Sequence, residues 1–196
     1  MQLKTKVKVG NITNLSDARY CAGMGVDLLG FPIGDTDGKI SFDTFLEIAE
    51  WIAGPAFILE YTDSMDDELF QKVTQSTAVQ HVQLNYDQLS RLGDKVDKLS
   101  IILKTSIAEW KDIKVHLSTY NIAYLVLAES ITPEWNVVGE INSVINVLIP
   151  QHLVENMSKV ESLPITGILM EGSSEDKPGQ KDYDHLANVL ETLEVD

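Results

Sequence analysis

The chain has 196 residues, 44% of them hydrophobic, which is enough to bury one sizeable core, and its length favours a single domain over residues 1–196. The formal net charge of −15 and an isoelectric point near 4.5 argue against nucleic acid as a partner, because phosphate backbones are bound by clustered Lys and Arg. The apolar runs are too short to span a bilayer and no signal peptide opens the chain, so we expect a cytoplasmic protein without membrane contact.

Short β-branched and aliphatic runs alternate with longer amphipathic segments along the whole chain. This alternation is typical of repeated strand–helix units around a parallel sheet. Eight runs fit strands, and they predict an α/β fold, a compact (β/α)8 TIM barrel with an open doubly wound sheet as the alternative. The predicted strands are Lys6 to Gly10, Leu28 to Ile33, Ala56 to Thr62, Val79 to Leu84, Ser100 to Lys104, Ala123 to Leu127, Ser143 to Ile149 and Ile165 to Met170.

The helices between these strands are indicated with unequal clarity. Ser41 is a helix cap that precedes an apolar stripe from Phe45 to Ile52 at helical spacing. A last amphipathic helix follows Asp182. The sixth helical segment, Thr132 to Gly139, is short and interrupted by proline and glycine, so it fits a loop or a single turn.

Several short motifs resemble one enzyme family. Lys8 to Asn11, followed by Ile12 to Ala18, resembles the K-[IV]-C-G and I-T-N-x-x-D-A that open the barrel of phosphoribosylanthranilate isomerase. Gly23 to Phe31 resembles the family's A-G-A-D-x-[IL]-G-F, Val82 to Asn85 its V-Q-L-H, and Pro178 to Asp182 its P-G-x-K-D. The matches occur in order along the chain and are most specific at its two ends.

The resemblance implies the Amadori rearrangement of N-(5-phosphoribosyl)anthranilate in tryptophan biosynthesis, which needs a general base, a general acid and a phosphate site. The family's base is the cysteine after the first strand, and it aligns with Gly10, which has no side chain. The family's acid is an aspartate that aligns with Ala128. Glu129 beside it is a candidate acid if a β-bulge aims it inward; otherwise it is a solvated loop carboxylate.

The phosphate-binding motifs of the family are altered as well. Its Gly-Gly after the seventh strand aligns with Pro150 and Gln151, and proline has no amide hydrogen to offer an oxyanion. At the motif after the eighth strand, Glu171 replaces a serine, Gly172 is retained and Ser173 is displaced. A carboxylate at this position repels phosphate unless it turns away.

Two further family positions differ, and the strand ends carry a new set of polar residues. The family's S-P-R-Y arginine is displaced to Lys39, and the histidine of V-Q-L-H becomes Asn85. Polar residues expected around the C-terminal mouth of the barrel are Asn11, Glu60, Asn85, Lys104, Glu129, Gln151 and Glu171. The candidate ligand-binding residues are Asn11, Lys39, Asn85, Gln151, Glu171, Gly172 and Ser173.

Three functions are compatible with this pattern. The first is a divergent isomerase that uses Glu129; the second, which the residues favour, is a noncatalytic barrel that binds a small ligand or partner. The third is an enzyme with changed chemistry, assisted by a metal at Glu60, Glu129 and Glu171. We expect a small-molecule ligand at the mouth, no cofactor and no resident metal, and an ion pair between Lys104 and a neighbouring carboxylate; the oligomeric state is left open.

Overall fold

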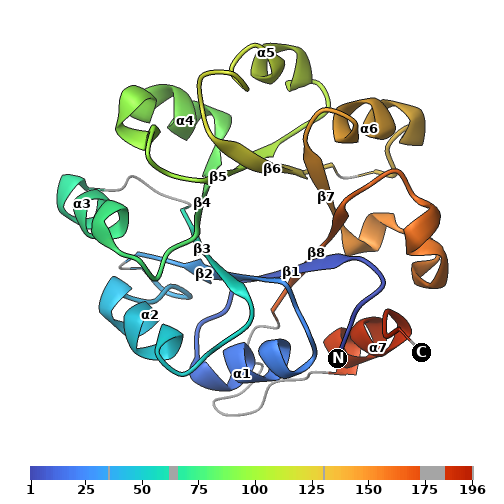
Figure 1. Ribbon diagram of the computed structural model, residues 1–196, viewed down its shortest axis with the longest axis horizontal. Coiled ribbons are helices and arrows are strands. Elements are labelled where there is room, and N and C mark those ends of the chain that lie inside the picture. Colours follow the sequence, from blue (N-terminus) through green and yellow to red (C-terminus); the bar gives the residue numbers. More distant parts are fainter. Residues whose placement is uncertain (35, 62–65, 130, 173–183, 196) are drawn as a thin grey trace.

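The computed structural model describes residues 1–34, 36–61, 66–129, 131–172 and 184–195, which form a closed barrel of eight parallel strands ringed by helices (Figure 1). The strands pair in chain order, and the first pairs with the eighth to close the sheet. The predicted (β/α)8 architecture is therefore confirmed, and the open doubly wound alternative is wrong.

All eight predicted strands are present. They are β1 (Lys6–Gly10), β2 (Leu28–Pro32), β3 (Ala56–Glu60), β4 (His81–Asn85), β5 (Ile101–Thr105), β6 (Ile122–Leu127), β7 (Asn146–Pro150) and β8 (Gly167–Glu171). β1 has the predicted bounds. β7 begins three residues later than predicted, because the chain from Ser143 onward first turns out of the preceding helix.

Seven α-helices and three short 3-10 helices accompany the strands in the described ranges. The α-helices are α1 (Leu15–Gly23), α2 (Phe42–Ala49), α3 (Asp67–Gln75), α4 (Tyr86–Leu92), α5 (Trp110–Lys114), α6 (Trp135–Asn142) and α7 (Asp184–Thr192). The 3-10 helices are Gly93–Val96, Gln151–Leu153 and Met157–Ser162. The predicted cap at Ser41 is confirmed, since its hydroxyl accepts a hydrogen bond from the Thr44 amide at 3.1 Å. The predicted last helix is α7, and Asp182 lies outside the described residues.

The sixth helical segment forms a helix of eight residues, so neither the loop nor the single turn is correct. Pro133 precedes α6 and therefore removes none of its internal hydrogen bonds. Gly139 lies within the helix, and a Cβ there would stand only 3.1 Å from the Cβ of Pro164. The glycine thus permits close packing of α6 rather than ending it.

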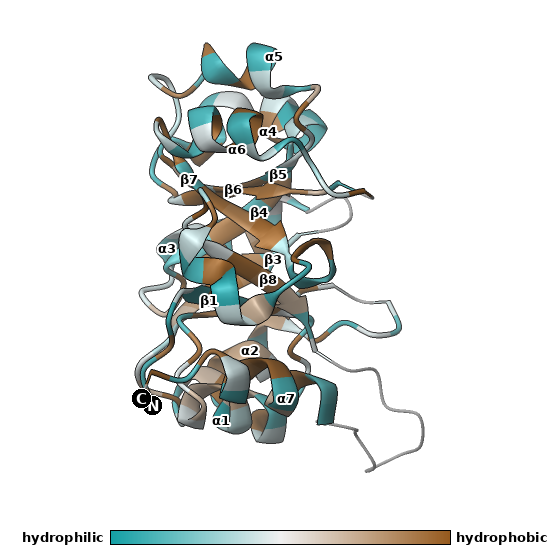
Figure 2. Cartoon of the chain, turned by 90° about the vertical axis from the view of Figure 1, so that its right-hand side faces the viewer, coloured by the Kyte–Doolittle hydropathy of each residue, from teal (hydrophilic) through white to brown (hydrophobic). Residues whose placement is uncertain are grey.

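The core has two layers, and the strands form the apolar centre of the molecule (Figure 2). The larger layer lies between the barrel and its helices, as in the contact of Phe31 with Phe45, whose ring centroids are 5.1 Å apart. The smaller layer fills the barrel itself with Leu28, Ile58, Ile102, Val126, Leu148 and Leu169. The barrel is consequently closed at mid-height, and a ligand site has to lie at one of its ends. Within the described ranges, every helix is too short or too polar to cross a membrane.

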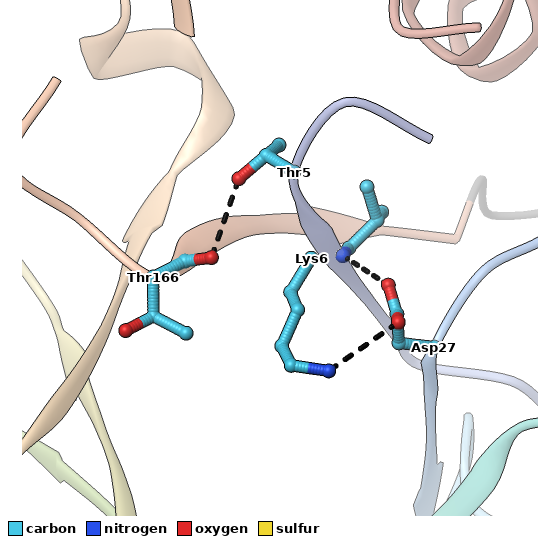
Figure 3. Close-up of polar contacts among 5 residues, drawn as sticks. Thr5, Lys6, Asp27 and Thr166 are labelled. Atoms are coloured by element: carbon cyan, nitrogen blue, oxygen red, sulfur yellow. Dashed lines mark hydrogen bonds and ion pairs between the residues drawn. The ribbon is translucent and has the colours of Figure 1, made fainter. Parts of the chain in front are cut away.

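Polar contacts tie β1 to both of its neighbours at the N-terminal end of the barrel (Figure 3). The Asp27 carboxylate, just before β2, accepts from the Val7 amide at 2.8 Å and lies 3.5 Å from Lys6 Nζ. The Thr5 hydroxyl donates to the carbonyl of Thr166, just before β8, at 3.3 Å. These contacts join β1 to β2 and to β8 where the barrel closes.

The closing seam also depends on Gly167, because a Cβ there would collide with the carbonyl oxygen of Lys6. We expect Gly167→Ala to lower the free energy of unfolding by about 1–3 kcal/mol, since β1 and β8 must shift apart. Gly23→Ala is the matched control: an added Cβ meets no atom within 4 Å, and the change should be neutral or stabilising by about 0.5–1 kcal/mol. Urea unfolding followed by circular dichroism measures both, and equal effects would contradict the packing argument.

Candidate functional site

A cavity of about 430 Å³ opens at the C-terminal ends of β5 to β8. This is the end of the barrel at which (β/α)8 enzymes hold their active sites. The apolar part of its lining is Val126, Ala128, Pro150, Leu169 and Met170. The polar part is Lys104, Glu129, Gln151, His152, Glu171 and His185. We call it the β5–β8 cavity, and its mixed lining is typical of a small-molecule site.

A second cavity of about 460 Å³ lies over β3 to β5 and shares Lys104 and Ala128 with the first. Two of its lining side chains, Tyr61 and Gln83, have buried oxygens without a hydrogen-bond partner among the described residues. Burial also raises the pKa of Tyr61, and the negative charge of Asp66 adds to this while Arg91 opposes it. Neither side chain was proposed from the sequence, since Tyr61 reads as an ordinary strand-end aromatic.

A buried ion pair lies beneath the mouth, between Lys8 of β1 and Glu60 of β3. Their side chains are only 1% and 8% exposed. Lys8 Nζ donates to Glu60 Oε1, and Glu60 Oε2 accepts from the Asn11 amide at 2.9 Å. Because buried charges are tolerated only when they are paired and hydrogen-bonded, these contacts fix both side chains in place. The sequence placed Glu60 at the mouth but gave no role to Lys8.

Glycine at position 10 makes room for this ion pair. A Cβ on Gly10 would lie 2.6 Å from Glu60 Oε1, 3.0 Å from Glu171 Oε2 and 3.2 Å from Lys8 Nζ. Charged groups from β1, β3 and β8 thus surround the position that aligns with the family's cysteine. Any side chain at position 10 requires these groups to move.

Asn11 and Gly172 shape the backbone of the loops at the mouth. Asn11 has a φ of 58°, a left-handed conformation that asparagine tolerates better than most residues and that explains a glycine at the aligned family position. The Gly172 amide donates to the Gly10 carbonyl at 2.8 Å and so joins the loops after β8 and β1. In the described parts of the chain, neither residue lines either cavity.

Glu171 is the carboxylate whose environment is most unusual. It lines the β5–β8 cavity and is open to it, yet the surrounding barrel wall excludes enough water to raise the pKa of its carboxyl group. The negative charge of Glu60 raises this pKa further, and Lys8 and Lys104 lower it in part. A carboxyl group in such a setting retains its proton closer to neutral pH, as a general acid requires.

Glu129 lines the same cavity but has a structural contact. Its Oε1 accepts from the Ile107 amide at 2.6 Å, which anchors the connection between β5 and α5. This geometry matches the loop-carboxylate interpretation of Glu129 more closely than that of an acid aimed into the barrel.

The other candidate residues divide between the cavities and the surface. Gln151 lines the β5–β8 cavity, and Asn85 lines the second one while its side chain caps α4 by accepting from the Gln88 amide at 2.8 Å. Lys39 lies between β2 and α2 and, in the described ranges, lines neither cavity. Ser173 and the motif at 178–182 lie outside the described residues.

The structure contradicts one expectation and one alternative about the charged groups. Lys104 is exposed at the mouth and forms no ion pair with a described residue, because the carboxylates beside it are held elsewhere or lie out of contact. Glu60, Glu129 and Glu171 do not converge on a metal, and the described residues contain no group of three potential ligands. Glu60 is engaged by Lys8, and Glu129 by a backbone amide, which keeps the three apart.

Comparison with known proteins supports the resemblance drawn from the motifs. The chain is 28% identical over 121 residues to the N-(5'-phosphoribosyl)anthranilate isomerases of two Bacillus cereus strains, AH187 and Q1. The match spans 59% of this chain and 57% of the relatives' own length. No family model matches the chain.

Solved isomerase structures share the fold. The enzyme from Pyrococcus furiosus superposes with a TM-score of 0.70 at 20% identity, and that from Thermotoga maritima with 0.70 at 18%. A third, solved with reduced 1-(o-carboxyphenylamino)-1-deoxyribulose 5-phosphate, gives 0.70 at 19%. Each alignment covers 96% of this chain and 98% of the other. Sequence and fold together confirm the resemblance to the phosphoribosylanthranilate isomerase family.

The packing around Gly10 can be tested by a double-mutant cycle. Gly10→Ala should lower the free energy of unfolding by about 1–3 kcal/mol, because the added methyl group displaces the Glu60 carboxylate. In a Lys8→Met/Glu60→Ala background the same change should cost less, leaving a coupling energy of about 0.5–3 kcal/mol. Urea unfolding of the four proteins provides the values. The same cost in both backgrounds would mean that the ion pair does not restrict position 10.

The raised pKa of Glu171 predicts a pH-dependent gain from its neutralisation. A carboxyl group whose pKa is raised by folding stabilises the protein fully below its unfolded pKa and loses that contribution as the pH rises through its folded pKa. Glu171→Gln should therefore raise the urea midpoint at about pH 8 and change it little at about pH 4. Glu140→Gln, an exposed change on α6, is the matched control and should show no such difference. A decrease at the higher pH would refute the argument.

Proposed function

We propose that this barrel, a relative of the phosphoribosylanthranilate isomerases, binds a small molecule without a phosphate group at its C-terminal mouth and does not catalyse the family's Amadori rearrangement. The observation that carries this proposal is the buried Lys8–Glu60 pair over Gly10. The pair stands where the alignment puts the family's cysteine.

The groups near Gly10 are poor substitutes for a general base. Lys8 is buried, its Nζ donates to Glu60 Oε1, and it does not line the β5–β8 cavity, so it is held away from a substrate there. Glu60 uses both oxygens on Lys8 and the Asn11 amide and is shielded from the cavity. A base has to come within hydrogen-bond reach of the substrate carbon-bound proton, and these contacts keep both groups from doing so.

The phosphate half of the mouth is equally unsuited to its family role. Pro150 stands where the family has a glycine and offers no amide hydrogen. The 3-10 helix that follows, Gln151–Leu153, has only three residues and provides little helix dipole. Glu171 opens into the same cavity, and its negative charge disfavours a phosphate dianion there. The apolar lining favours a ligand without phosphate.

A second candidate function is an isomerase with a relocated acid. Glu171 fits that role better than Glu129, because it opens into the cavity and its pKa is raised, whereas Glu129 is bound by the Ile107 amide. This candidate needs a base that the described residues do not offer at Gly10.

The two candidates differ in turnover of phosphoribosylanthranilate. We expect the purified protein, given this compound generated in situ, to consume it no faster than buffer does, as measured by the decrease of its fluorescence. Gly10→Cys should not restore activity, because the cysteine would lack an acid and a phosphate site and would disturb the Lys8–Glu60 pair.

The isomerase of Thermotoga maritima serves as the positive control for this assay. Turnover by the unmodified chain would overturn the proposal. In that event, loss of turnover in Glu171→Gln would identify the relocated acid as Glu171, and loss in Glu129→Ala but not in Glu171→Gln would identify it as Glu129.

A further inference from the structure

Two opposite charges enter the β5–β8 cavity from different strands of the barrel. Lys104 comes from β5 and Glu171 from the end of β8, and both side chains are exposed there. Among the described residues, neither side chain has a hydrogen-bond or ion-pair partner. They are close enough for Lys104 to affect the Glu171 carboxyl group electrostatically, but they do not neutralise each other by contact.

The surroundings of Glu171 favour the arrival of a cation. The barrel wall limits its hydration, and Glu60 brings a negative charge close to it that Lys8 and Lys104 offset only in part. A ligand ammonium group placed against Glu171 would supply the pairing that no described side chain gives it. The nearby Lys8 is engaged by Glu60 and cannot move to do so.

The surroundings of Lys104 favour an anion in the same way. Its ammonium group stands at the boundary of the two mouth cavities. Glu129, the other carboxylate of the β5–β8 cavity, accepts from the Ile107 amide instead. A carboxylate is the anion that suits this position, since a phosphate dianion would face both Glu171 and Glu129 with more charge.

Beside its polar residues, the cavity has an apolar lining. Val126 and Leu169 belong to the inner core layer, and Pro150 and Met170 add apolar lining at the ends of β7 and β8. A volume of about 430 Å³ accommodates a molecule with one ring or one branched chain. An apolar ligand body would remove this surface from water.

We propose that the β5–β8 cavity binds a small zwitterion with an apolar body, of the class of a free hydrophobic amino acid, with its carboxylate on Lys104 and its ammonium group on Glu171. This inference rests on the proposed function and names the class of its ligand. A simple carboxylic acid leaves Glu171 unpaired and is repelled by it, and a simple amine meets Lys104 in the same way. Only a ligand with both charges satisfies both side chains.

Isothermal titration calorimetry with three matched probes tests this proposal. Phenylalanine should bind, whereas 3-phenylpropionate, which lacks the ammonium group, and phenethylamine, which lacks the carboxylate, should bind at least about tenfold more weakly. Lys104→Met should weaken phenylalanine binding by about tenfold or more and should not weaken the binding of phenethylamine. Glu171→Gln should likewise weaken phenylalanine binding by about tenfold or more and should not weaken the binding of 3-phenylpropionate. Leucine and tryptophan extend the test to other apolar bodies.

Lys111→Met on α5 and Glu140→Gln on α6 are matched controls, since both side chains are exposed and line neither mouth cavity. They should leave the affinity for phenylalanine unchanged. Absence of binding by all three amino acids at millimolar concentration, or equal binding of the three matched probes, would overturn the inference. Neither outcome depends on turnover of phosphoribosylanthranilate, so failure here is distinguishable from failure of the proposed function.

Discussion

The Lys8–Glu60 ion pair is the constraint on which the mouth of this barrel depends. Charged groups inside a barrel are held only where each hydrogen bond is made, and here Glu60 bridges Lys8 and the backbone of Asn11. The space for its carboxylate exists because both Gly10 and Gly30 lack a Cβ that would collide with it. The position of the Glu60 carboxylate therefore requires glycine at two positions and fixes the loop after β1. Glu60 also adds to the effect of burial, which is the main cause of the raised pKa of Glu171.

The residues that hold the barrel together are different from the charged residues that determine the chemistry of its mouth. At mid-height the barrel is closed by an ordinary apolar layer, from Leu28 to Leu169, which any sequence of similar volume and pattern can supply. Nearer the mouth the barrel contains charged side chains, and the positions of Lys8 and Glu60 depend on their hydrogen-bond partners. Glu171 is held at a cost in its charged form, which natural proteins accept mainly at sites of binding or catalysis.

The sequence predicted the barrel because its signals are local and repeated. Each of the eight strands contains closely spaced β-branched or aliphatic residues, so their number and order follow without knowledge of the partners. α6 was ambiguous because Pro133 and Gly139 are residues that usually end a helix. Gly139 instead allows α6 to pack closely against Pro164, which is distant in the sequence. Lys8 was missed for the same physical reason: its partner Glu60 is 52 residues away, and in a strand buried on both faces the alternation of Lys6, Val7 and Lys8 does not reveal which lysine is enclosed.

Resemblance to a family is stronger evidence for the fold of this chain than for its catalytic activity. At 18–20% identity the aligned structures share the path of the chain over nearly its whole length, because apolar positions tolerate exchange among residues of similar size. A proton transfer tolerates no such exchange, since it needs one particular group at one particular distance. Gly10 illustrates the difference: it pairs with Glu171 of β8 in the barrel sheet, while the Glu60 carboxylate occupies the space that a catalytic side chain at position 10 would need. Similarity of fold therefore indicates only where a ligand site is expected, and the charges at that place limit which ligand would fit it.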